Sequence, residues 1–228
     1  VWDIEEIGEF YKTAKKIGIP AVFYTLGYRY ISKQIISKDF MQETVPEKTS
    51  PEDVGFEKVG KTSVFSLISG SFSTTEFDVY EKRENNATRV LLTEPNLGQL
   101  YESAKDSDHR LYQQIVLGFG GHKWSKVKRE KPAALQLNES ATVFAALAEL
   151  DGTLKRESDF ERALAVVREK TIYTNHTVVP AADATFSRNQ YERFVFPNIE
   201  SEDLKRWLRG IINDFCGALR LNMLALAL

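Results

Sequence analysis

Two clusters of polar side chains each follow a short apolar segment and have the residue types that bind a polar ligand. Asn138 and Glu139 come directly after one such segment, and Asn175 and His176 come directly after another. A carboxylate beside an imidazole can fix the tautomer of the ring and raise its pKa, which leaves the second ring nitrogen for a ligand. These four residues are therefore the candidate ligand-binding residues of the chain.

The two clusters form one site only if the segments before them are neighbouring strands of a parallel sheet. The apolar and β-branched composition of residues 133–137 and 171–174 predicts two short strands. Helical periodicity over 140–150 and 158–167 predicts two helices between them. This order is typical of a parallel crossover, and ligands bind beyond the carboxyl ends of such strands. The alternative that these polar side chains only satisfy backbone groups of their own loops stays open.

Other patterns that carry chemistry are absent or incomplete in the sequence. The glycines of 118–121 lack the third glycine of a dinucleotide-binding loop, since position 123 is lysine, so a helix irregularity is the favoured interpretation. His109, His122 and His176 show no metal-ligand spacing with Cys216 or with carboxylates. The sequence contains no Gly-x-Ser-x-Gly motif, so a hydrolase of that class has no nucleophile here.

The rest of the chain predicts an α/β domain with a β-rich insertion at about 44–93. Asp151-Gly152 is expected to end the first helix of the crossover, and a capping box at Ser158 to start the second. Outside the crossover, the expected elements are a helix at 4–17 ended by Gly18, a strand within 21–30, a loop or insertion at 44–60, two antiparallel strands within 62–84, a strand at 89–93, and an amphipathic helix at 203–215.

Composition narrows the function classes. The 228 residues include 30 basic and 32 acidic side chains, so no strong positive field favours nucleic acid. The single cysteine excludes an internal disulfide framework and is typical of a reducing compartment. The apolar stretches are shorter than the roughly 20 residues that cross a membrane, and no signal peptide is recognisable. We expect a cytoplasmic protein that binds neither nucleic acid nor membrane. We also expect this chain to be a piece of a longer protein.

Four segments in the same order resemble the α-glucan (glycogen, starch and maltodextrin) phosphorylases. The most specific, Thr171-Ile-Tyr-Thr-Asn-His-Thr-Val-Val-Pro180, closely resembles that family's Tyr-Thr-Asn-His-Thr-Val-Leu-Pro segment. Order and spacing agree over roughly residues 10–228. The other three segments are Leu135-Gln-Leu-Asn-Glu139, Tyr112-Gln-Gln-Ile-Val-Leu-Gly-Phe-Gly-Gly121, and Gly27-Tyr28-Arg29-Tyr30 followed by Phe40-Met41-Gln42-Glu43.

The resemblance implies a retaining glycosyltransferase of the GT-B type, built from two Rossmann-like domains. Such enzymes use inorganic phosphate to release glucose 1-phosphate from the end of an α-1,4-glucan, with pyridoxal phosphate bound in the C-terminal domain. Residues 1–228 would be a single incomplete N-terminal domain, inactive alone, of a parent protein that would form a homo-oligomer. By the family pattern His176 contacts the glucosyl unit, Glu139 supports that histidine, and Asn138 shapes the turn; Asn175 belongs to the same substrate-binding group.

The sequence also departs from the family pattern. Ala141 stands where family members carry a histidine, Gln113-Gln114 replaces a Gln-Glu pair, and residues 1–10 replace a glycine-rich loop. These departures motivate an alternative, a non-catalytic phosphorylase-like protein that binds glucan or builds an oligomer. A further alternative is an unrelated α/β domain, which would be favoured if the strands at 133–137 and 171–174 were not adjacent and parallel.

Overall fold

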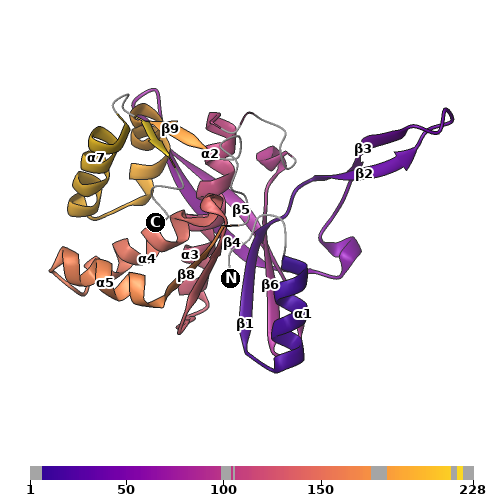
Figure 1. Cartoon of the computed structure of the whole chain (residues 1–228), viewed down its shortest axis with the longest axis horizontal. Helices are drawn as coiled ribbons and strands as arrows, with labels where there is room; N and C mark the ends of the chain where they lie inside the picture. Colours follow the sequence, from indigo (N-terminus) through magenta and orange to yellow (C-terminus); the bar gives the residue numbers. More distant parts are fainter. Residues whose placement is uncertain (1–6, 99–103, 105, 176–183, 217–219, 223–228) are drawn as a thin grey trace.

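The computed structural model describes residues 7–98, 104, 106–175, 184–216 and 220–222 and shows a mixed α/β fold (Figure 1). The helices and strands are α1 (Ile7–Ile17), β1 (Ala21–Leu26), β2 (Tyr30–Ile36), β3 (Gln42–Lys48), β4 (Glu57–Ile68), β5 (Ser71–Glu84), β6 (Ala87–Thr93), α2 (Asp108–Ile115), η3 (Val116–Gly120), α3 (Gly121–Val127), β7 (Leu135–Asn138), α4 (Phe144–Leu154), α5 (Phe160–Lys170), β8 (Thr171–Thr174), β9 (Thr185–Ser187), α6 (Arg188–Gln190), α7 (Glu202–Cys216) and β10 (Arg220–Asn222).

A four-stranded sheet with the order β1-β6-β5-β4 forms the centre of the molecule. β1 pairs with β6 in parallel, whereas β5 pairs antiparallel with both β6 and β4. The antiparallel strands predicted within 62–84 and at 89–93 are confirmed, and they share one sheet with β1. The loop expected at 44–60 is shorter than predicted, because β3 reaches Lys48 and β4 begins at Glu57. Whether residues 44–93 are an insertion relative to other proteins stays a prediction.

Both faces of β1 are buried, because successive side chains of a strand point to opposite sides. Phe23 packs with Tyr11 and Ala14 of α1, while Tyr24 and Leu26 belong to the larger apolar cluster. Figure 1 shows α1 on one side of β1 and β6 and the other helices on the opposite side. Helix α1 ends where predicted, and Gly18 follows it with a φ of 75°.

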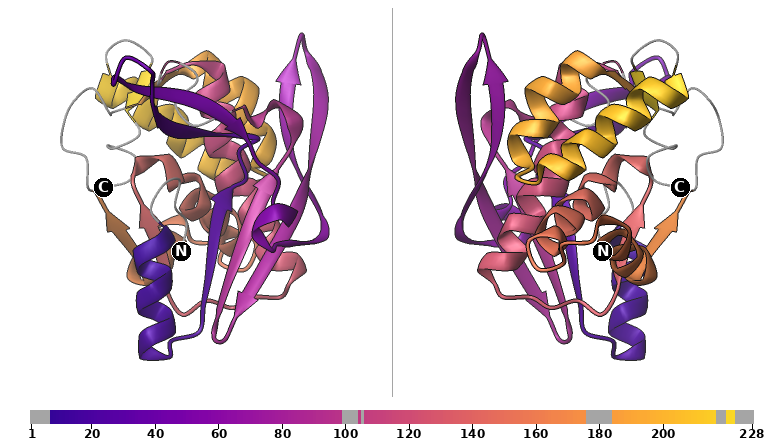
Figure 2. Two further views of the ribbon diagram at one scale, coloured as in Figure 1. Left: turned by 90° about the vertical axis from the view of Figure 1, so that its right-hand side faces the viewer. Right: turned by 90° about the vertical axis from the view of Figure 1, so that its left-hand side faces the viewer.

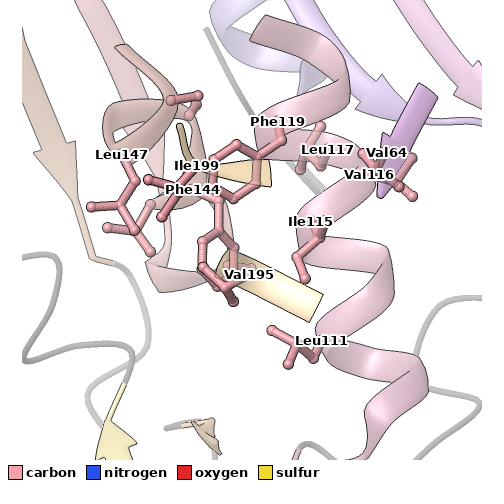
Figure 3. Close-up of a cluster of buried hydrophobic side chains, with 14 of the residues drawn as sticks. Val64, Leu111, Ile115, Val116, Leu117, Phe119, Phe144, Leu147, Val195 and Ile199 are labelled. Carbon is pink, nitrogen blue, oxygen red and sulfur yellow. The ribbon is translucent and has the colours of Figure 1, made fainter. Parts of the chain in front are cut away.

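The larger core forms around α2, the π-helical turn η3, and α3, which follow one another without a break (Figure 3). Leu111 and Ile115 of α2 and Phe119 of η3 are fully or almost fully buried, and the rings of Phe119 and Phe144 lie 5.8 Å apart. The amphipathic helix predicted at 203–215 is confirmed as α7, with Leu204, Leu208 and Ile212 in this core.

Strands β2 and β3 form a two-stranded antiparallel hairpin that projects away from the sheet (Figures 1 and 2). Phe40, between the two strands, is 90% exposed. In the part of the chain that the structure describes, no helix is both long and apolar enough to cross a bilayer.

Candidate functional site

The strands before the two polar clusters are adjacent and parallel, as the sequence predicts. β7 and β8 pair in register from Leu135 opposite Thr171 to Asn138 opposite Thr174. The backbone N–H of Glu139 donates to the carbonyl of Thr174 at 2.8 Å and extends this pairing by one step. Glu139 and Asn175 therefore leave the sheet at the same edge, beyond the carboxyl ends of both strands. This strand order disfavours the alternative of an unrelated α/β domain.

Glu139 has a backbone conformation that is unusual for a residue with a side chain. Its φ of 67° and ψ of 158° fall in a region that is populated almost only by glycine. The backbone is held there from both sides: its N–H binds Thr174, and its carbonyl accepts from the N–H and the hydroxyl of Thr142 at 3.1 and 2.8 Å. Such strain costs about 1–3 kcal/mol and is typical of functional sites.

The other candidate residues differ in their surroundings. Asn138 is only 2% exposed, whereas Glu139 and Asn175 are half-buried. The side-chain amide of Gln136 in β7 donates to the hydroxyl of Thr174 in β8 at 2.6 Å, which links the two strands. His176 lies outside the described residues, so its expected contact with Glu139 stays a prediction. The structure thus brings three of the four candidate residues to one sheet edge.

Ala141 is buried at the position where the family resemblance leads us to expect a histidine. It is 7% exposed and belongs to the larger apolar core. Ala141 lies in the short 3₁₀ turn of residues 140–142, and this turn begins directly after Glu139. Position 141 therefore contributes packing rather than a hydrogen-bonding group at this edge of the sheet.

The glycine cluster at 118–121 serves close packing, which agrees with the interpretation as a helix irregularity. A Cβ atom on Gly118 would lie 2.4 Å from the Cβ of Phe144, and one on Gly120 would lie 2.6 Å from the ring of Phe77. Both distances are shorter than real contacts allow. These two glycines let the helix approach α4 and β5, and they lie within a π-helical turn rather than in a strand-to-helix loop.

A buried ion cluster around Glu149 was not recognisable from the sequence. This carboxylate of α4 accepts from His122 at 2.8 Å, from Lys126 at 2.9 Å, and from Lys170. Burial alone would raise the pKa of Glu149, but the hydrogen bonds from these three side chains hold it well below its ordinary value. The cluster joins α3, α4 and the end of α5. Glu149 lies more than 20 positions away from each of its three partners, so residue spacing gave no signal for the cluster.

The histidines have different partners. His122 binds Glu149, and the Nε2 atom of His109 lies 3.2 Å from the side-chain nitrogen of Gln113. Within the residues that the structure describes, no three side chains of the His, Cys, Asp and Glu types gather in a way that could hold a metal ion.

Comparison with known proteins confirms the resemblance to α-glucan phosphorylases. A maltodextrin phosphorylase of Thermococcus litoralis is 33% identical over 107 residues, which cover 47% of this chain and 12% of that protein. A glycogen phosphorylase of Mycobacterium tuberculosis is 31% identical over 96 residues, covering 40% and 11%. A glycogen phosphorylase of Aquifex aeolicus is 33% identical over 109 residues, covering 45% and 15%.

No protein-family model matches the chain. The matched segments span only 11–15% of the length of these three relatives. The chain is thus similar to a segment of phosphorylases that act on maltodextrin or glycogen.

Proposed function

We propose that this chain is the incomplete N-terminal domain, residues 1–228, of an α-glucan phosphorylase with the GT-B architecture. The observation that carries the proposal is the parallel pairing of β7 and β8, which brings Glu139 and Asn175 to one edge. The sequence similarity to maltodextrin and glycogen phosphorylases supports it. The reaction of the parent is the phosphorolysis of an α-1,4-glucan to glucose 1-phosphate.

In this proposal the strand ends bind the terminal glucosyl unit. The carboxylate of Glu139 accepts from one ring nitrogen of His176 and so fixes the tautomer, which leaves the other ring nitrogen to accept a hydrogen bond from a sugar hydroxyl. Asn138, buried at the end of β7, holds the turn, and Asn175 supplies a side-chain amide that can both donate to and accept from hydroxyl groups. These residues orient the sugar, and none of them is assigned to bond cleavage.

Pyridoxal phosphate is the cofactor that the resemblance implies, and it needs a lysine amine for its Schiff base. Three lysines near the core do not fit this role: Lys126 and Lys170 donate to Glu149, and Lys123 donates to the carbonyl of Ser63 at 3.0 Å. We therefore assign the cofactor, whose phosphate group would donate and accept a proton, to the C-terminal domain of the parent.

The partners in this proposal are a maltodextrin or longer α-glucan and inorganic phosphate. The 228-residue chain alone has no phosphorylase activity, because it lacks the cofactor domain and the second wall of the cleft. The parent is placed in the cytoplasm and forms a homo-oligomer.

Glucan affinity of the full-length protein tests the assignment of the strand-end site. Glu139→Gln keeps the size of the side chain but removes the charge that supports His176, so the affinity for maltoheptaose should fall about tenfold or more. Glu157→Gln is the matched control, because Glu157 pairs with an exposed arginine, Arg162, at the start of α5. Calorimetric titration measures both. Equal maltoheptaose affinity in Glu139→Gln and the unmodified protein would contradict the proposed site.

A further inference from the structure

A cavity opens at the other pair of parallel strands, where β1 and β6 end. It has a volume of about 580 Å³ and is lined by Arg29, Tyr30, Asn96, Gly98 and His109, together with two prolines. β1 and β6 pair in parallel over their whole length, so their carboxyl ends meet at this edge of the sheet. This is the position at which ligands bind in parallel α/β sheets, and it lies on different strands from the glucan site proposed above.

The backbone around Arg29 is held in place by hydrogen bonds from two other segments. Its N–H donates to the carbonyl of Gly98 at 3.2 Å, and its carbonyl accepts from the N–H of Thr49 at 3.0 Å. Gly98 has a φ of 64° and a ψ of −130°, which requires glycine. The residues that flank the β2–β3 hairpin and the segment after β6 are therefore fixed relative to each other at the cavity.

The Arg29 guanidinium is exposed and faces no competing carboxylate among the cavity-lining residues that the structure describes. The guanidinium lies over the Tyr30 ring, 5.8 Å from the ring centroid. It forms no ion pair with a residue in the described part of the chain. The nearest acid along the chain after β6, Glu94, is buried and engaged: it accepts from the N–H of Asn96 at 2.8 Å and from the Tyr112 hydroxyl at 3.0 Å.

His109 contributes a second hydrogen-bond donor, because its neighbour Gln113 fixes the tautomer. The Gln113 side-chain oxygen accepts from Arg110 at 3.2 Å, and its nitrogen donates to the carbonyl of Leu97 at 2.8 Å, which defines the orientation of the amide. The same nitrogen lies 3.2 Å from Nε2 of His109. Nε2 is therefore the acceptor, and the neutral ring carries its proton on Nδ1.

We infer that this cavity is an oxyanion site that binds a phosphate group through Arg29 and His109. An arginine and an imidazole donor without a carboxylate match the oxygens of phosphate, which only accept hydrogen bonds when fully ionised. Neutral sugars have hydroxyl groups that both donate and accept, and they gain less from a set of donors. Inorganic phosphate and a sugar phosphate share the recognised group.

Calorimetric titration of the full-length protein with inorganic phosphate, glucose 1-phosphate and maltose tests this inference. Arg29→Gln should weaken phosphate binding at least tenfold, whereas Arg29→Lys should retain part of the affinity. The control is Arg83→Gln, which removes a 66% exposed arginine of β5 and should leave phosphate affinity unchanged. Tighter binding of glucose 1-phosphate than of phosphate would identify a sugar phosphate as the ligand, and the reverse would identify free phosphate.

The site assignment is overturned if Arg29→Gln binds phosphate as tightly as the unmodified chain, or if it loses maltose affinity to the same degree as phosphate affinity. Unchanged thermal unfolding of Arg29→Gln shows that the fold is intact, which is expected because the hydrogen bonds to Gly98 and Thr49 are made by backbone groups of Arg29. The Glu139→Gln variant should keep phosphate binding in this cavity, so failure of the glucan site and failure of the anion site give different results.

Discussion

Glu139 combines an acidic side chain with backbone angles that suit glycine. Hydrogen bonds to Thr174 and Thr142 maintain this strained backbone conformation. They hold Glu139 at the edge of the sheet, directly beside the end of β8. A residue without a function at this position would be expected to be glycine, because glycine adopts this conformation without strain. An acidic residue at position 139 therefore costs stability, which agrees with the role proposed for it.

Substitution at position 139 separates the strain from the carboxylate. Glu139→Ala keeps the strained backbone, whereas Glu139→Gly relieves about 1–3 kcal/mol of strain and loses part of it to the greater freedom of the unfolded chain. Glu139→Gly should therefore be about 1 kcal/mol more stable than Glu139→Ala. Chemical denaturation of the two variants measures this difference. A glycine variant that is less stable than the alanine variant would show that the backbone is not strained.

At this scale the sequence indicates residue types and their shared edge, but not their conformation. The placement of Asn138, Glu139 and Asn175 together follows from strand periodicity and crossover topology, and it is confirmed. The positive φ of Glu139 depends on Thr174, 35 positions away in the chain, and local propensity gives no sign of it. The Arg29 cavity likewise depends on the hairpin, β6 and α2 coming together.

Helices α3, α4 and α5 are joined by the buried carboxylate of Glu149. Glu149→Gln removes the negative charge that the ammonium groups of Lys126 and Lys170 share, and it leaves these two cations close together without a carboxylate. Breaking such a buried pair costs about 3–5 kcal/mol. We expect a loss of about 3 kcal/mol in the free energy of unfolding, measured by urea denaturation.

Glu76→Gln is the matched control for Glu149→Gln. Glu76 is exposed and lies 3.5 Å from Lys61, so its loss should change the free energy of unfolding by about 0.5 kcal/mol or less. Similar losses in the two variants would show that the Glu149 cluster does not hold the three helices together.

Helix α1 should loosen from the sheet in acid. Its Lys15 donates to Glu84 of β5 at 2.6 Å, and this hydrogen bond and the charge of Arg89 lower the pKa of Glu84 from 4.5 to about 2. A carboxylate with a lowered pKa stabilises the fold above its unfolded pKa, and the effect is lost as the pH falls from about 4.5 to about 2. Hydrogen-exchange protection of α1 should decline over this window.

Glu84→Gln tests whether the acid dependence of α1 comes from this carboxylate. In this variant the protection of α1 should be lower at neutral pH and nearly independent of pH between about 4.5 and 2. An unchanged decline in Glu84→Gln would assign the acid dependence to another group.

Elements with strong local signals were predicted well, and those decided by distant contacts were not. Thr171–Thr174 is β8 with the predicted bounds, because β-branched residues dominate it. The expectation that Asp151-Gly152 ends a helix was wrong, since α4 continues to Leu154. The Asp151 carboxylate instead accepts from the backbone N–H groups of Glu200 and Ser201, just before α7. Helix α5 is capped by Asp159 rather than by Ser158.

The whole molecule has two parallel strand pairs, and each of them ends in a polar edge. The pair β7–β8 carries the candidate sugar residues, and the pair β1–β6 carries the cavity with Arg29 and His109. The proposed glucan site and the proposed oxyanion site therefore lie at different edges, on different strands. The similarity covers 11–15% of the length of three known phosphorylases.

Release of glucose 1-phosphate from maltoheptaose and inorganic phosphate tests the proposed function most directly. The full-length protein loaded with pyridoxal phosphate should release it, Glu139→Gln should reduce the rate about tenfold or more, and the 228-residue chain alone should release none. The account is contradicted if the loaded full-length protein releases no glucose 1-phosphate, or if the 228-residue chain releases it without the rest of the protein.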